Sequence, residues 1–71
     1  MAGITYQHKL RYKGKEYVGE MTEYADVCEE LVYEDGNFLY RQEFPRSNLG
    51  AASRDEYVRV MTASIAEQKG K

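Results

Sequence analysis

The stretch that most constrains the fold of this chain is Leu31–Phe44, LVYEDGNFLYRQEF, with Asp35-Gly36 at its centre. Asp-Gly favours the positive φ angles of a two-residue type I′ turn, which joins two antiparallel strands. A hairpin folded there pairs Glu30 with Arg41, an opposite-charge pair that supports a sheet. Because side chains alternate between the two faces of a strand, we expect one face to carry Val27, Leu31, Tyr33, Phe38, Tyr40 and Phe44.

A second hairpin is predicted at the start of the chain. Ile4–Tyr12 alternates apolar and polar residues, as a half-buried strand does, and Lys13-Gly14 supplies a weaker turn signal. A two-residue turn there pairs Leu10 with Tyr17 and predicts a second strand at about Lys15–Met21.

The fold depends on how the two hairpins are joined. If Thr22–Asp26 is a loop, the four strands form an antiparallel meander in which Tyr17 faces Leu31 and Gly19 faces Glu29. The inner rows are then Tyr6–Met21–Val27–Phe44 and Leu10–Tyr17–Leu31–Tyr40. The alternative is a helix at about 23–35, for which Tyr24, Val27, Cys28, Leu31 and Val32 have helical spacing and Gly36 would be the C-terminal stop.

A C-terminal helix at about 54–69 follows a polar loop at 45–52. Ser53 and Glu56 form the pattern of a capping box, and Asp55 with Arg59 has the spacing of an ion pair. The predicted apolar stripe of this helix is Tyr57, Val60, Met61, Ser64, Ile65 and Gln68. We therefore predict an α+β domain, ββββα, with ββαβα as the alternative if the helix at 23–35 forms.

The length of 71 residues fits a single small domain spanning 1–71, with a sheet at about 4–44. Such a domain buries a limited core, and its one cysteine, Cys28, cannot form an internal disulfide. We therefore expect self-association into a homodimer. The sequence has no apolar run long enough to cross a membrane and no secretion signal at its start. These features predict a soluble cytoplasmic protein without a membrane partner, of bacterial or phage type.

Catalytic chemistry is not expected. His8 and Cys28 are the candidate reactive side chains, and the predicted register places His8 on the inner face and Cys28 on the outer face of the sheet. We expect no cofactor and no metal site. The row His8–Gly19–Glu29–Gln42 interrupts the apolar inner face with polar residues. It indicates a buried polar network, the lining of a small pocket, or an error in the register.

The distribution of charge favours a protein-binding function. The formal net charge is −2, with acidic residues concentrated in 16–40 and basic residues in 1–15. Tyrosine, present seven times, is enriched at interfaces because it joins apolar area to a polar tip. We predict a non-enzymatic, regulatory or inhibitor-like interaction module that binds a basic protein surface. Its partner-binding residues would be Glu20, Glu23, Tyr24, Asp26, Glu30, Tyr33, Glu34 and Asp35.

The alternative function is single-stranded nucleic-acid binding. A four-stranded sheet with a helix also occurs among small single-strand binders, which is an analogy of fold alone. Such binding needs a basic stripe with aromatic residues. The candidate residues are Lys9, Arg11, Lys13, Arg41 and Arg46, although acidic residues on the neighbouring strand oppose this function.

Overall fold

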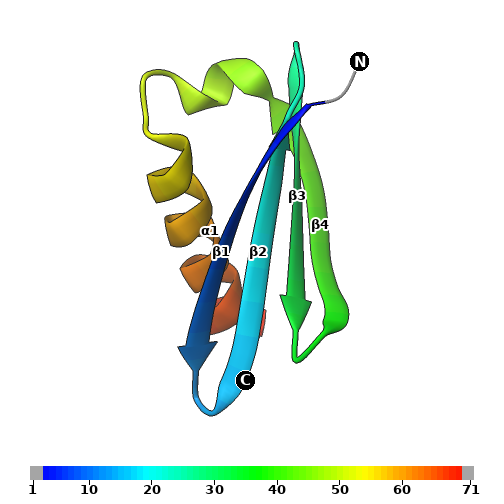
Figure 1. Cartoon of the computed structure of the whole chain (residues 1–71), viewed down its shortest axis with the longest axis vertical. Helices are drawn as coiled ribbons and strands as arrows, with labels where there is room; N and C mark the ends of the chain where they lie inside the picture. Colours follow the sequence, from blue (N-terminus) through cyan, green and yellow to red (C-terminus); the bar gives the residue numbers. More distant parts are fainter. Residues whose placement is uncertain (1–2, 70–71) are drawn as a thin grey trace.

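The computed structural model describes residues 3–69 and has the architecture ββββα (Figure 1). The elements are β1 (Ile4–Tyr12), β2 (Lys15–Glu23), β3 (Val27–Glu34), β4 (Asn37–Pro45), a short 3₁₀ helix η1 (Arg46–Leu49) and α1 (Arg54–Lys69). The strands form one antiparallel sheet in the order β1-β2-β3-β4. The predicted meander is confirmed, and residues 23–35, the alternative helix, are strand and turn instead.

Both tight turns form as predicted. Lys13 and Gly14 have φ of 52° and 80°, and Asp35 and Gly36 have φ of 49° and 83°. Two successive residues with positive φ are the signature of the type I′ turn, whose twist matches that of the flanking strands. The register between β1 and β2 is also as predicted, with Leu10 opposite Tyr17.

The register between β2 and β3 differs from the prediction by three residues. Tyr17 lies opposite Glu34 rather than Leu31, and Gly19 lies opposite Val32 rather than Glu29. The difference arises because β2 continues through Glu23, so that the connection is shorter than the predicted loop. An odd shift moves every side chain of a strand to the other face.

The buried face of β3 is therefore the face that the sequence pattern predicted to be exposed. Cys28, Glu30 and Val32 are completely buried, whereas Val27, Leu31 and Tyr33 are only partly buried. The prediction that Cys28 points outward was wrong. The predicted polar row containing Glu29 does not form either, because Val32 lies between Gly19 and Tyr40 on that row.

A β-bulge sets the register between β3 and β4. Tyr33 lies opposite Phe38 as predicted, but the register shifts between Val32 and Tyr33, so that Val32 pairs with Tyr40. A bulge inserts one residue into one strand and moves the following side chains to the other face. The predicted pair of Glu30 with Arg41 was consequently wrong, and Glu30 lies opposite Gln42.

The helix α1 packs mainly over β1 and β2 (Figure 1). Its buried residues are Val58, Thr62, Ile65 and Ala66. The closest approach is at Gly19, where an added Cβ would lie 1.7 Å from Thr62 Oγ1. Gly19 therefore lets the helix lie directly on β2.

The helix begins and ends close to the predicted positions, but its orientation about its own axis differs. Ser53 caps the N-terminus, since the backbone N–H of Glu56 donates to Ser53 Oγ over 3.4 Å. Arg59 pairs with Glu56 rather than with the predicted Asp55. Val60, which the predicted stripe placed in the core, is 51% exposed. The buried arc of the helix is thus rotated away from the predicted stripe.

Candidate functional site

The predicted partner-binding residues do not form one surface. Glu20 and Tyr33 lie on the outer face of the sheet, the face opposite α1. Tyr24 and Asp26 lie in the connection between β2 and β3, and Glu34 and Asp35 lie at the turn between β3 and β4. Glu23 and Glu30 are buried. These two carboxylates belong to the interior, which corrects their placement on a binding surface.

Glu23 anchors the end of the sheet to the segment that precedes α1. Its carboxylate accepts hydrogen bonds from Arg46 Nε over 2.5 Å and from Arg54 Nε over 3.1 Å. The hydrogen bonds from Arg54 and Arg46 lower the pKa of Glu23 to about 2. This carboxylate therefore stays charged at neutral pH and ties the starts of η1 and α1 to the end of β2.

Glu30 is the polar residue buried at the centre of the inner face, with 0% exposure. Gln42 Nε2 donates to its Oε1 over 2.5 Å, and Tyr40 in turn donates to Gln42 Oε1 over 2.5 Å. Its second oxygen, Oε2, has no hydrogen-bond partner within residues 3–69. Burial raises the pKa of the Glu30 carboxyl. The predicted row His8–Gly19–Glu29–Gln42 is thus wrong, and a different polar network, Glu30–Gln42–Tyr40, lies on this face.

Glu34 and Asp35 join the two hairpins. The Tyr17 hydroxyl donates to Glu34 Oε2 over 2.7 Å, which raises the pKa of Tyr17 to about 12. The backbone N–H of Glu16 donates to Asp35 Oδ1 over 2.9 Å, and the Asp35 N–H donates to the Glu16 carbonyl. Glu34 therefore lies on the inner-face row with Tyr17, where it also pairs with Lys15, and Asp35 is exposed at the turn.

An aromatic pair marks the outer face of the sheet. The rings of Tyr33 and Phe38 meet edge to face with centroids 6.3 Å apart, and Phe38 is 61% exposed. In the sheet these residues continue the row Lys9–Val18–Tyr33–Phe38. Leu31 lies in the adjacent row, between Glu20 and Arg41. The sequence indicated a core position for Phe38, and only the bulge and the altered register show that it is on the surface.

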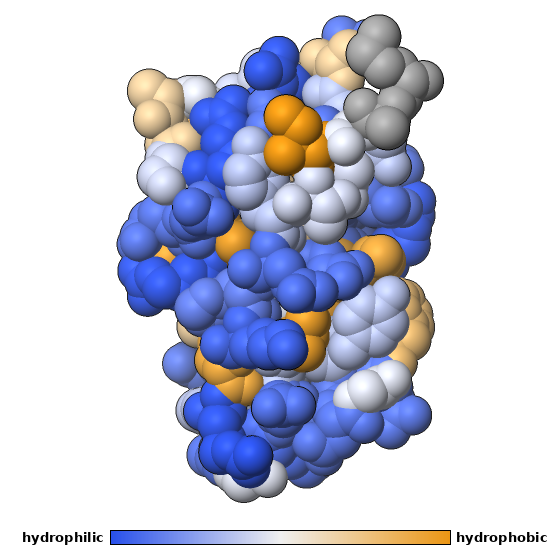
Figure 2. Space-filling view, viewed as in Figure 1, coloured by the Kyte–Doolittle hydropathy of each residue, from blue (hydrophilic) through white to orange (hydrophobic). Residues whose placement is uncertain are grey.

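The side of the molecule seen in Figure 2 is mostly hydrophilic, with small separate hydrophobic patches. On the outer face Phe38 is exposed and its ring meets that of the partly buried Tyr33. The pair Tyr33–Phe38 therefore marks the candidate contact surface on the sheet.

The predicted nucleic-acid-binding residues are also separated. Lys9 and Arg11 lie on the outer face of β1, and Lys13 lies in the adjoining turn over the Tyr12 ring. Arg41 is bound by Glu29 and Glu43, and Arg46 is bound by Glu23 at the other end of the sheet. The five basic residues do not form a continuous stripe.

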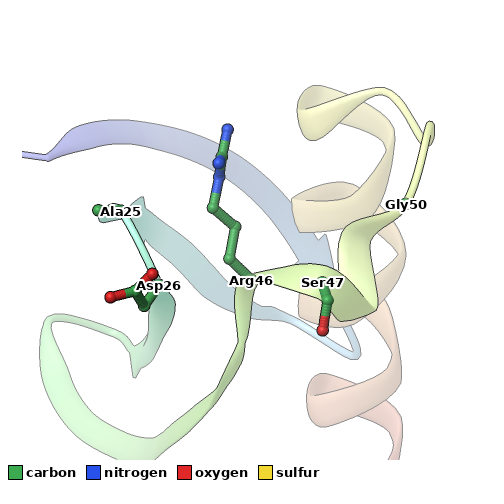
Figure 3. A pocket seen from close by; sticks show the side chains of 5 residues that line it. All are labelled: Ala25, Asp26, Arg46, Ser47 and Gly50. Atoms are coloured by element: carbon green, nitrogen blue, oxygen red, sulfur yellow. The ribbon is translucent and has the colours of Figure 1, made fainter.

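A hollow of about 540 Å³ lies at the end of the sheet where Arg46 begins η1. Ala25, Asp26, Arg46, Ser47 and Gly50 line it, and the Asp26 and Arg46 side chains point in different directions (Figure 3). The contact that joins the two loops here is the backbone N–H of Arg46 donating to the Asp26 carbonyl over 3.0 Å. The lining side chains do not converge on a point where a substrate would react.

His8 and Cys28 both lie on the inner-face side of their strands. Burial raises the pKa of the Cys28 thiol, which disfavours the reactive thiolate. Within residues 3–69, no group of three or more His, Cys, Asp or Glu side chains is arranged to hold a metal ion. No helix within this range is long and apolar enough to cross a membrane.

Comparison with protein-family models, with curated proteins and with solved structures found no match to this chain.

Proposed function

We propose that this chain is a small, non-enzymatic protein-interaction module of a regulatory or inhibitor type. Its partner binds on the outer face of the sheet, around Tyr33 and Phe38. The observation that carries the proposal is the 61% exposure of Phe38 on the face of the sheet opposite α1. Burying an exposed aromatic ring in a partner's pocket is a common source of binding energy in protein interfaces.

The charges around the aromatic pair favour a basic partner. Glu20 lies one row away from Tyr33, and its side chain has an uncharged neighbour, Gln7, as hydrogen-bond donor. Asp35 is exposed at the adjoining turn, whereas Glu34 is paired with Lys15 and Tyr17 on the inner-face side. A basic partner surface would be attracted to this acidic, tyrosine-bearing rim and would exclude like-charged competitors.

The module is proposed to act as a homodimer in the cytoplasm. The chain has one cysteine, and its buried thiol has no disulfide partner. A free thiol is compatible with a reducing compartment. Self-association would supplement the small core of a 71-residue chain.

The experiment is affinity capture from a lysate of the native host, with wild-type chain and two variants as bait. Phe38→Ser removes the exposed ring, and Ile4→Ser removes a side chain of similar exposure, 62%, at the far end of β1. We expect Phe38→Ser to lose the captured partner by tenfold or more (about 1.4 kcal/mol or more) and Ile4→Ser to retain it. Equal capture by both variants would refute the assignment of this face.

Single-stranded nucleic-acid binding is the alternative, and one observation favours it. The row Lys9–Val18–Tyr33–Phe38 places a basic residue and two aromatic rings in one row of the outer face. A binder of this kind loses affinity steeply as salt rises. Fluorescence anisotropy with single-stranded oligonucleotides at low salt tests it, and an unchanged signal would remove it.

A further inference from the structure

The open edge of β1 carries backbone groups that can bond to another strand. β1 is the first strand in the order β1-β2-β3-β4, so one of its sides has no neighbouring strand within residues 3–69. The Glu16 N–H donates to Asp35 Oδ1, and the Glu16 carbonyl accepts from the Asp35 N–H. Both backbone groups of Glu16 thus point away from β1, which makes Arg11 and Glu16 a pair without backbone hydrogen bonds. The N–H and C=O of Arg11 therefore point to the open edge.

Three further residues of β1 share the orientation of Arg11. Bonded and non-bonded pairs alternate along an antiparallel ladder, so Thr5, Gln7 and Lys9 also direct their N–H and C=O to the open edge. The side chains of these residues lie on the outer face and are exposed. A strand added here would bond to the main chain of β1 without breaking the bonds that join β1 to β2.

The two edges of the sheet differ in their capacity to accept a strand. β4 ends at Pro45, which has no backbone N–H, and it contains the extra residue of the bulge, Leu39. Proline and bulges are the means by which proteins prevent an edge from pairing. β1 has neither between Ile4 and Tyr12, and its register with β2 is regular. The edge of β1 is therefore the one open to a further strand.

The charges on β1 specify an acidic strand. Lys9 and Arg11 are exposed, and no carboxylate within residues 3–69 forms an ion pair with either of them. Opposite charges in facing positions support a sheet, whereas like charges destabilise it. The β1 edge of a second copy would bring its own basic residues against these two. The edge thus disfavours self-pairing and favours a strand with carboxylates on its outer face.

The inner side of β1 favours apolar side chains on the same strand. Tyr6, Leu10 and Tyr12 are half-buried and pack against the core next to the open edge. The closest approach of α1 to the sheet is at Gly19 of β2, so the helix lies on the inner face and not beside β1. Because strand residues alternate between faces, a segment of alternating acidic and apolar residues fits both sides of this edge.

We propose that the edge of β1 binds an extended, acidic segment of another protein, which adds to the sheet as a fifth, antiparallel strand. This site goes beyond the proposed function, because it is separate from the pair Tyr33–Phe38 and takes a partner of opposite charge.

A nuclear magnetic resonance titration of the full, isotope-labelled chain tests the proposal. The probe is a short, capped peptide of alternating glutamate and valine. The backbone amide signals of Thr5, Gln7, Lys9 and Arg11 should shift, because their N–H groups gain acceptors, and those of the alternate residues should shift less. Lys9→Glu should raise the dissociation constant of the peptide about threefold or more. Arg41→Glu makes the same charge change on the outer face of β4 and should leave the dissociation constant unchanged.

N-methylation of the peptide gives a control that needs no protein variant. In an antiparallel pair, the glutamates opposite Lys9 and Arg11 direct their own N–H groups to β1, whereas the valine N–H groups point away. The peptide with N-methylglutamate should therefore lose binding, and the peptide with N-methylvaline should keep it.

Three results would overturn the proposal: the absence of amide shifts with the unmethylated peptide, equal effects of the two methylated peptides, or equally large shifts of the same amides with a single-stranded oligothymidylate. Phe38→Ser should leave the titration unchanged, so that its outcome is independent of the partner-capture experiment.

Discussion

At the scale of single residues, Glu30 makes the stability of the domain depend on pH. Its carboxyl is completely buried, and Oε2 has no hydrogen-bond partner within the described residues. Burial raises its pKa in the folded chain above the value in the unfolded chain. The folded state therefore favours the protonated form, and stability is highest below the unfolded pKa and falls as pH rises through the folded one.

We predict that Glu30→Gln stabilises the domain at pH 7. The amide keeps the shape of the side chain and removes the buried charge, which should raise the free energy of unfolding by about 1–3 kcal/mol. The gain should shrink as pH approaches 4, because Glu30 is then protonated in the wild-type chain as well. Urea unfolding of both proteins between pH 4 and pH 8 measures it, and a constant difference across that range would contradict the account.

Glu23 changes stability with pH in the opposite direction to Glu30 and at lower pH, so it provides an internal control. Arg54 and Arg46 lower its pKa to about 2. The stability that this carboxylate contributes is present above its unfolded pKa and is lost as pH falls towards 2. The same unfolding experiments should therefore show a loss of stability at acidic pH in both wild type and Glu30→Gln. Only the loss of stability at higher pH should be absent from the variant.

At the scale of the elements, the contact of α1 with β2 depends on Gly19. Gly19→Ala would place a Cβ 1.7 Å from Thr62 Oγ1, and we predict a loss of about 1–3 kcal/mol in the free energy of unfolding from overpacking. Thr62→Ala removes that oxygen, and the double variant should be more stable than the sum of the single effects by about 0.5–3 kcal/mol. Strictly additive effects in this double-mutant cycle would mean that the helix does not lie on Gly19.

Several elements of this fold could be predicted from the sequence alone. Turn chemistry and alternation predicted both hairpins, the register of β1 with β2, and the extent of α1, because each depends on local signals. The face of β3 was not predictable in this way. Its apolar residues Val27, Leu31 and Tyr33 favour one face, while the structure buries the other face, including Glu30.

The cause lies in contacts between distant residues. The bond from Tyr17 to Glu34 and the cluster of Glu23 with Arg46 and Arg54 accompany the observed register, and each joins residues at least 17 positions apart. The bulge beside Tyr33 also has no sequence signature here. For these reasons the acidic residues predicted from the sequence do not form one surface, and the candidate site is the pair of Tyr33 and the exposed Phe38. Glu20 and Tyr33 are the predicted partner-binding residues that lie on the outer face.

At the scale of the whole molecule, the proposed binding surface lies on the side of the sheet opposite α1. The outer face presents Tyr33 and Phe38, with Glu20 in the adjacent row, for a partner of another kind. A homodimer that leaves both outer faces exposed could bind two partner molecules and gain avidity where those are linked.

Site-specific photocrosslinking in cells of the native host tests the proposed binding face most directly. A photoreactive phenylalanine analogue at position 38 should give a discrete adduct with another protein. The same analogue at position 4, where Ile4 is 62% exposed at the far end of β1, should give no such adduct. Lysine at Glu20 should weaken the adduct from position 38. Absence of any heterologous adduct from position 38 would contradict the claim that the outer face binds a partner.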